Sequence, residues 1–435
     1  MNYQIKISTL KTAFTLFGIA FFTKLINGID MLVSSGGTEP YIENAAGSLM
    51  NKAFGSFILL VCLILAFRYK RLKPILTDGK NLAFILFCLY ALASVIWSVE
   101  PAVSMRRVIF FFAVVAFAYY LVEMYSYKTV FRFIGYTIGA CALFSLITMV
   151  IIPEKVTILS GPRAGAVKGI FVDKNGAART YMAGLAMLVP LVLNRDRKAI
   201  FFSACMAIML FATRSVSGIF LTFIALATTG YFYYITLSGA LNKSLVRYKV
   251  RFALITYISG LTVAYLMYAV LLELVGRDAT LTNRTLIWEL ILPSVYDKLA
   301  LGWGFGAYWA SWGVQEFMER WGYIGNAHNG FIETLLHGGI PFLVLLVITI
   351  IAALYQLLKY QNLRQRPLEN YICISLIIVY TIANFVGYTL PNHNAVDFFI
   401  FSYIVLLSTK YVGSRQGSYD SKQSRLSRIP KIRLR

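Results

Sequence analysis

The chain is poor in charge, and most of its charges have one sign. Charged residues make up 14% of its 435 residues, with 19 Asp and Glu against 41 Lys and Arg. A soluble domain carries about 25% charged residues, so the composition excludes an ordinary globular protein. A net charge of +22 would suggest nucleic-acid binding in a soluble protein. Membrane proteins concentrate Lys and Arg in cytoplasmic loops, and the composition favours that interpretation.

Cysteine, histidine and nucleotide-binding motifs are scarce or absent. The 5 cysteines lie in apolar segments without CxxC spacing, which argues against a disulfide framework or a zinc site. No HExxH motif accompanies the 3 histidines, so we expect no metal site. P-loop, GxGxxG and GxSxG motifs are also absent, and we expect neither a nucleotide-consuming reaction nor a cofactor.

Long apolar runs are what the chain has in abundance, since 58% of its residues are hydrophobic. Runs that approach the roughly 20 apolar residues needed to cross a bilayer predict an all-α, polytopic membrane protein with about twelve transmembrane helices. We place the spans near residues 12–29, 53–67, 81–97, 108–124, 133–152, 180–194, 199–213, 217–238, 252–275, 338–358, 371–389 and 396–409.

The loops between these spans alternate in charge. One set, together with the two tails, carries 27 of the 41 Lys and Arg and five of the 19 acidic residues, so the rest of the chain holds 14 of each. The whole net charge thus lies on one side, which the positive-inside rule makes cytoplasmic. Both termini are predicted to be cytoplasmic. Residues 1–410 form a single membrane domain, and residues 411–435 a basic tail that we expect to be disordered near anionic lipid, with no role in nucleic-acid binding.

Three long loops fall on the outer face: residues 30–52, 153–179 and 276–337. The last two are rich in Gly, Asn, Arg and aromatic residues. Because long loops on a rigid scaffold commonly carry function, we expect residues 153–179 and 276–337 to form the site.

His328 lies where the last of these loops meets an apolar span. A histidine is a plausible general base near neutral pH, although a helix-capping or interfacial role would also explain this one. His337 follows nine positions later, and on a continuous helix the two rings would point to opposite sides, which makes them a poor metal pair. His337 and His393 are interpreted as structural. Glu333 is either a partner of His328 or part of a polar helix face.

Several cationic residues share the outer loops with His328. Arg277 and Arg284 are seven positions apart, so on a helix they would share a face. Arg214 lies in a turn too short to leave the membrane far, where an arginine is usually paired or functional. A guanidinium fork suits phosphate oxygens. Pairing with local acids, or snorkelling to the membrane surface, would also explain each arginine.

The loop of residues 153–179 ends in GPRAGAVKGIFVDKNGAAR, and this end segment sets four basic residues against one acid, Asp173. The basic residues are Arg163, Lys168, Lys174 and Arg179. A basic outer loop departs from the positive-inside pattern and suggests an anionic ligand, although an exposed amphipathic helix is an equal alternative. Taken together, outer-face cations, one candidate base and many aromatic residues suit a lipid-bound pyrophosphate that carries a sugar.

Several segments resemble the O-antigen ligase and Wzy-type polymerase superfamily, most closely the exopolysaccharide polymerases of the succinoglycan type. They are GRDATLTNRTLIW, LGWGFGAYW, HNGFIETLLHGGIP and GIFVDKNGAA, within residues 160–345. The resemblance implies a GT-C-like architecture and a glycosyltransferase that uses a polyprenyl-diphosphate-linked donor. It implies inverting, metal-independent transfer from an undecaprenyl-pyrophosphate-linked glycan to a sugar hydroxyl.

The resemblance also assigns residues. It implies that His328 activates the acceptor and that Arg284, Arg277 and Arg214 hold the pyrophosphate. Further candidates for substrate binding are Arg163, Lys174, Asn175, Asn329, Trp288 and Trp303.

The leading hypothesis is a polymerase of a surface polysaccharide or exopolysaccharide in the bacterial inner membrane, with its active site facing the periplasm or the exterior. A flippase and a chain-length regulator are the expected protein partners. The alternatives are a ligase that attaches finished glycan to lipid A core and, in another class, a transporter of a small solute or anion. Transporters place ionisable residues near the membrane midplane, whereas these candidates gather on the outer face, which favours the enzyme.

Overall fold

A computed structural model of the chain describes residues 7–26, 28–29, 49–68, 79–160, 163–237, 284–314, 325–359 and 368–410. These residues are mainly helical, and within them the sole β-bridge joins Thr157 and Val167. Eleven of the twelve predicted spans contain a helix, and six helices are long and apolar enough to cross a membrane. The prediction of an all-α, polytopic membrane protein is confirmed. The span near 252–275 and the tail of residues 411–435 lie outside the described residues.

The helices at the predicted spans are α1 (Ile7–Phe22), α3 (Leu49–Arg68), α5 (Leu82–Ala93), α6 (Pro101–Met124), α7 (Tyr127–Ile151), α9 (Lys174–Leu193), α10 (Arg197–Ala212), α11 (Val216–Leu237), α15 (Gly330–Lys359), α16 (Leu368–Phe385) and α17 (Val396–Lys410). Five shorter elements lie between them: η1 (Gly79–Asn81), α8 (Pro153–Val156), α13 (Arg284–Asp297), η4 (Tyr308–Ala310) and η5 (Trp312–Val314).

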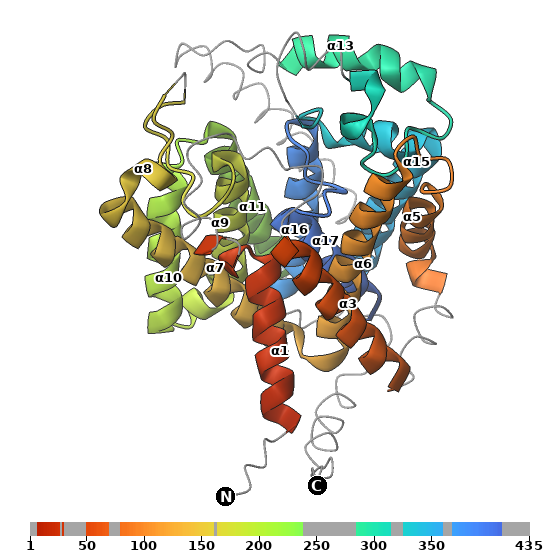
Figure 1. The fold of residues 1–435 in the computed structure, drawn as a ribbon. Helices are drawn as coiled ribbons and strands as arrows, with labels where there is room; N and C mark the ends of the chain where they lie inside the picture. Colours follow the sequence, from red (N-terminus) through yellow and green to blue (C-terminus); the bar gives the residue numbers. More distant parts are fainter. Residues whose placement is uncertain are drawn as a thin grey trace, which may run out of the picture.

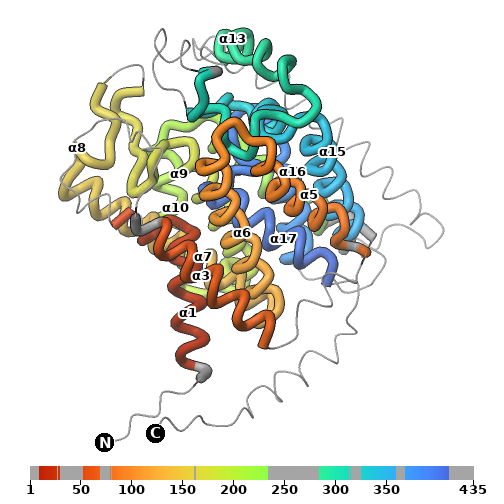
Figure 2. The backbone as a smooth tube through the Cα atoms, turned by 45° about the vertical axis from the view of Figure 1, so that its right-hand side comes forward, coloured from red at the N-terminus to blue at the C-terminus, as the bar shows by residue number. Residues whose placement is uncertain are grey.

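The helices form two groups that α16 and α17 join (Figure 1). Helices α7, α9, α10 and α11 pack together on one side, and α5, α6 and α15 lie on the other. Helix α16 contacts α9 and α11 of the first group and α15 of the second. Helix α13 lies across the top of the bundle, as both backbone views show (Figures 1 and 2).

Small residues allow close packing in the first group. A Cβ atom at Gly135 would lie 2.5 Å from the Leu188 side chain, and one at Gly139 would lie 2.5 Å from Phe202. Helix α7 therefore approaches α9 and α10 at positions where only hydrogen fits. Such contacts are typical of helix association in membranes, where packing takes over from the hydrophobic effect.

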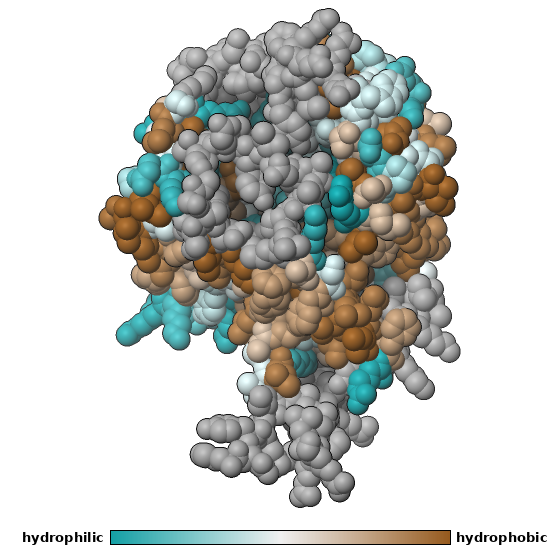
Figure 3. Space-filling model, in the orientation of Figure 1, coloured by the Kyte–Doolittle hydropathy of each residue, from teal (hydrophilic) through white to brown (hydrophobic). Residues whose placement is uncertain are grey.

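Polar contacts identify one end of the bundle. Lys11 in α1 donates to the Met124 carbonyl at 3.2 Å, and Lys410 at the end of α17 lies 3.0 Å from Glu123. The start of α1 and the end of α17 therefore lie beside the end of α6, as expected for an even number of spans. On the visible face, apolar residues form a broad band around the middle of the molecule (Figure 3).

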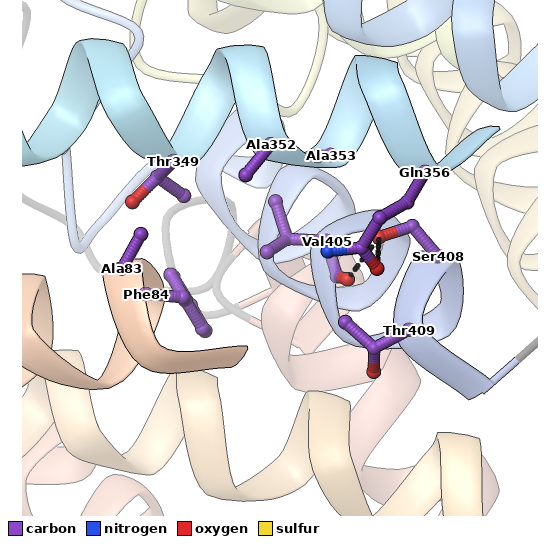
Figure 4. Close-up of a pocket in the computed structure, with 9 residues that line it drawn as sticks. All are labelled: Ala83, Phe84, Thr349, Ala352, Ala353, Gln356, Val405, Ser408 and Thr409. Atoms are coloured by element: carbon purple, nitrogen blue, oxygen red, sulfur yellow. Dashed lines mark hydrogen bonds between the residues drawn. The ribbon is translucent and has the colours of Figure 1, made fainter. Parts of the chain in front are cut away.

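A cavity of about 10 Å³ lies near this same end, between α5, α15 and α17 (Figure 4). Gln356, Ser408 and Thr409 supply most of its polar lining. A space of this size holds about one water molecule, so it is too small for a substrate.

A buried ion pair connects the two groups of helices near the opposite end. Arg179 Nε in α9 lies 2.8 Å from Asp397 Oδ2 in α17, and these side chains are 14% and 3% exposed. The basic residue that sequence assigned to an outer loop is thus paired inside the bundle. Removing one member of such a pair leaves an uncompensated buried charge, whereas replacing both members with apolar residues is often tolerated.

We expect Asp397→Asn to lower the free energy of unfolding by about 3–5 kcal/mol, since Arg179 would lose its partner. The double variant Arg179→Met with Asp397→Leu should recover much of that loss. Thermal unfolding of the purified protein in detergent measures both effects. A single variant as stable as the parent would contradict the structural role of the pair.

Candidate active site

The first turn of α9 is tied to the turn between α10 and α11. The carboxylate of Asp173 caps α9 by accepting from the amides of Asn175 and Gly176 at 2.9 and 2.8 Å. Lys174 is buried and donates to the Arg214 carbonyl at 3.3 Å. The Ser215 hydroxyl donates to Asn175 Oδ1 at 2.9 Å. Lys174 and Asn175 therefore hold the backbone that carries Arg214.

Arg214 is exposed and has a φ of 49°. Its Nη1 donates to the Ala164 carbonyl at 3.4 Å, and its guanidinium lies over Gly165, where a Cβ would be 2.8 Å from Nη1. The neighbouring Arg163 is also exposed. Two arginines far apart in sequence thus lie side by side at this end of the bundle, in agreement with the basic loop that the sequence predicts.

Lys168 completes this loop and is half-buried. Burial lowers the pKa of its amine. Its amide donates to the Val156 carbonyl at 2.8 Å, which fixes the loop against the end of α8.

Helix α13 brings Arg284 to the same end of the molecule. Arg284 is its first residue and is half-buried. One turn later, on the same face of the helix, Trp288 donates its indole N–H to the Ala327 carbonyl at 2.9 Å. Arg284 is thereby placed against the segment that contains His328. Arg277 and the shared helix face expected for it lie outside the described residues.

His328 lies in a loop two residues before α15 and has a φ of 50°. Its amide donates to Asn326 Oδ1 at 2.9 Å, and the side chain is half-buried. Next to it, Asn329 Oδ1 caps α15 by accepting from the Phe331 and Ile332 amides at 2.9 and 3.2 Å. The Asn329 oxygen is therefore used to begin the helix that places the histidine at the bundle end.

The two histidines do not share a helix. His328 precedes α15, whereas His337 lies inside it, just before non-helical backbone at Gly338 and Gly339. His337 is 1% exposed, and its Nε2 lies 3.3 Å from Glu333 Oε1. The geometry of a continuous helix over both residues is therefore wrong, but the interpretation of His337 as a buried residue apart from His328 agrees with its position.

Burial and nearby positive charge favour the neutral form of the His328 ring. Burial, and next the positive charge of Arg284, lower the pKa of His328 to about 4. Arg163 acts in the same direction, while the negative charges of Asp173 and Glu333 oppose it. Arg284 and Arg163 are thus near enough to the ring to affect its charge. A neutral imidazole at physiological pH has a nitrogen lone pair that can accept a proton.

Two sequence candidates are used differently from the expectation. Trp303 is 3% exposed and donates its indole N–H to the Ser294 carbonyl at 2.8 Å, so it is a core residue below α13. Trp288, half-buried, supports the Ala327 backbone. Within the described residues no group of three His, Cys, Asp or Glu could hold a metal ion.

Sequence reasoning gave Glu333 no definite role, although it contacts the histidine loop directly. Its Oε2 accepts from the Ala327 amide at 2.8 Å, and its Oε1 accepts from the Trp309 indole at 2.8 Å. The sequence signal for such a role was that Glu333 follows His328 by five positions in a chain with few acidic residues. The hydrogen-bond partners of Glu333 could not be predicted from sequence, because one donor lies in a loop and the other in η4.

The geometry can be compared with known proteins. Residues 201–347 match a family model described as O-antigen ligase, and this range contains Arg214, Arg284 and His328. The exopolysaccharide production protein ExoQ of Rhizobium meliloti (strain 1021) is 24% identical over 290 residues, which cover 63% of this chain and 64% of the relative. The alignment thus spans slightly less than two thirds of the relative. These comparisons confirm the resemblance to the O-antigen ligase and Wzy-type superfamily, with a relative that is named for exopolysaccharide production.

We expect the pKa of His328 to rise in Arg284→Gln, since the positive charge that lowers it is removed while burial is largely kept. The chain has 3 histidines, so isotope labelling of the histidine rings gives an NMR spectrum with few signals to assign. A pH titration of these signals by NMR, with His328→Gln to assign them, measures the shift. Arg195→Gln, an exposed arginine at the opposite end, is the control. An unchanged His328 titration in Arg284→Gln would show that the two groups do not interact.

Proposed function

We propose that the chain is a polysaccharide polymerase that transfers an undecaprenyl-pyrophosphate-linked glycan to the hydroxyl of an acceptor sugar. One observation carries this proposal: arginines from three separate segments lie at the same end of a membrane bundle as His328, two of them close enough to lower its pKa and the third against the backbone beside one of these two. They are Arg163, Arg214 and Arg284. Guanidinium groups match pyrophosphate oxygens with paired hydrogen bonds. Arg277 is the fourth candidate for this role.

The backbone around these residues supports a functional role. Four described residues other than glycine have a positive φ, and two of them are Arg214 and His328. Such conformations cost about 1–3 kcal/mol and persist where the surrounding structure enforces them, often at functional sites. The backbone is thus strained at Arg214 and His328, which the resemblance assigns to pyrophosphate binding and to acceptor activation.

In the proposed reaction the acceptor oxygen attacks the anomeric carbon from the face opposite the pyrophosphate. The carbon–oxygen bond to the pyrophosphate breaks, and His328 takes the hydroxyl proton. Negative charge builds up on the departing pyrophosphate, and the arginines stabilise it without a metal ion. The configuration at the anomeric carbon is inverted.

Binding of the donor should also strengthen the base. In the free protein, Arg284 and Arg163 lower the pKa of His328. A bound pyrophosphate brings negative charge to the same place and raises that pKa, because an anion stabilises the imidazolium form. Proton acceptance by His328 would therefore become more favourable only when the donor is present.

The site is proposed to face the periplasm or the exterior. The opposite end of the bundle carries Lys11, Lys410 and the basic turn around Arg195, which suits the cytoplasmic side of the bacterial inner membrane. A lipid-linked donor made in the cytoplasm then has to be delivered by a flippase, and a separate regulator would set chain length. The Rhizobium meliloti relative is named for exopolysaccharide production, which favours a polymerase over a ligase.

Arg284→Lys should be nearly as damaging as Arg284→Ala, since one ammonium group cannot reproduce two parallel N–H···O bonds. We expect about a 10- to 100-fold loss of kcat/KM, which corresponds to the loss of a charged hydrogen bond. Arg195→Lys serves as the matched control, because Arg195 also has a positive φ but lies at the cytoplasmic end. Turnover of a lipid-linked donor by the reconstituted protein is the measurement, and full activity of Arg284→Lys would refute the pyrophosphate clamp.

His328→Ala should abolish polymer without lowering the level of membrane-inserted protein. Cells that carry this variant in place of the parent should accumulate single repeat units on undecaprenyl pyrophosphate, and lipid extraction with mass analysis measures them. Accumulation of long lipid-linked chains would instead identify a ligase. Polymer of normal amount and length would rule out His328 as the base, and unchanged lipid pools together with altered solute uptake would identify a transporter.

A further inference from the structure

Ala327, the residue before His328, is held from both sides. The Ala327 amide donates to Glu333 Oε2 at 2.8 Å, and the Ala327 carbonyl accepts from the Trp288 indole at 2.9 Å. Ala327 is completely buried. Both polar groups of one residue are thus bound by side chains, one from α13 and one from α15, outside any regular secondary structure.

Glu333 is fully engaged in this arrangement. It is 1% exposed, and its second oxygen accepts from the Trp309 indole at 2.8 Å. His337 Nε2 lies 3.3 Å from the same oxygen. Each carboxylate oxygen therefore faces an N–H donor, which requires a group that only accepts hydrogen bonds.

The local backbone explains why this support is needed. His328 has a φ of 50°, a conformation that costs about 1–3 kcal/mol for a residue with a side chain. Such a conformation persists only where the surrounding structure enforces it. The bonds to Ala327 hold the residue just before the strained position, so they act directly on the direction of the imidazole.

Glu333 does not contact the imidazole of His328 through a hydrogen bond. Its oxygens are directed to Ala327 and Trp309, and within the described part of the chain the His328 ring has no hydrogen-bond partner. This arrangement differs from a carboxylate–histidine pair, in which the acid binds the ring. Glu333 therefore acts on His328 through the backbone of Ala327 and, without a direct bond, through its negative charge, which opposes the lowering of the His328 pKa.

We propose that Glu333 and Trp288 are positioning residues, which hold the backbone N–H and C=O of Ala327 and so keep the His328 ring in the direction that accepts the proton. The inference rests on the proposed function, since it assigns a purpose to the direction of His328. It also gives Trp288 a role different from sugar binding. The clamp joins α13, which carries Arg284, to the start of α15. The same two hydrogen bonds therefore fix the position of Arg284 relative to His328.

Two substitutions test the clamp. Glu333→Gln keeps size and burial but presents an NH₂ group to one of two N–H donors, so one bond to Ala327 or Trp309 is lost. Trp288→Phe removes a single indole N–H and keeps an aromatic ring. Trp97→Phe is the matched control, because Trp97 also donates its indole N–H to a loop carbonyl, that of Leu301, at 2.7 Å.

The expected result is a loss in kcat with little change in the KM for the lipid-linked donor, because the arginines remain in place. An unsatisfied buried donor corresponds to about a 10- to 100-fold effect, and we expect a loss of that size in Glu333→Gln and in Trp288→Phe. The double variant should lose less than the product of the two single effects, since both bonds hold the backbone of one residue, Ala327. Trp97→Phe should keep the parental kcat.

Ring NMR of the labelled histidines supplies a readout that does not depend on activity. The His328 signal should shift or broaden in both variants, while the signal of His393 stays in place. If Glu333→Gln fails to fold, Trp288→Phe alone decides the matter. Parental kcat and an unchanged His328 signal in Trp288→Phe would overturn the clamp. An inactive His328→Ala beside fully active clamp variants would refute only this inference, whereas an active His328→Ala would refute the proposed function itself.

Discussion

The buried ion pair between Arg179 and Asp397 is the contact on which the candidate site depends. It joins α9, whose first turn holds Arg214, to α17 on the other side of the bundle. The segment before α17 contains Gly387, whose carbonyl accepts from the Gly330 amide at the start of α15. This charged contact therefore connects the arginine half of the site to the histidine half, beside the contacts that α16 makes with α9, α11 and α15. A charge in an apolar interior is stable only with its partner, so the pair fixes how the two halves meet.

Acidic residues are few in this chain, and those near the site serve structure. Asp173 caps α9, Glu333 binds the Ala327 amide, and Asp397 neutralises Arg179. None of them shares a salt bridge with Arg163 or Arg214 among the described residues. The site thus keeps positive charge for an anion, while burial and that same charge hold His328 neutral. Because acids are scarce here, positive charge and a neutral histidine can lie close together.

Much of the architecture could be predicted from local patterns. Apolar runs of spanning length located the helices, and the distribution of Lys and Arg placed the loops of residues 153–179 and 276–337 at one end together. His328 and Arg284 were recognisable as a pair through motifs close in sequence. The sequence could not show that Arg179 and Arg163 have different roles, because both belong to one basic segment. Only the approach of α17 shows that Arg179 has a buried partner.

By itself, the sequence determined that this is a helical membrane protein. It also indicated which outer loops contain arginines and which histidine lies in the same loops. These properties follow from hydrophobicity and charge, which each residue has regardless of its neighbours in space. The tertiary structure decided the positive φ of Arg214 and His328, the neutral state of that histidine, and the opposite-sided support of Ala327 by Trp288 and Glu333. These depend on burial and on hydrogen-bond donors from segments far apart in the chain, and such partners exist only after the helices have packed.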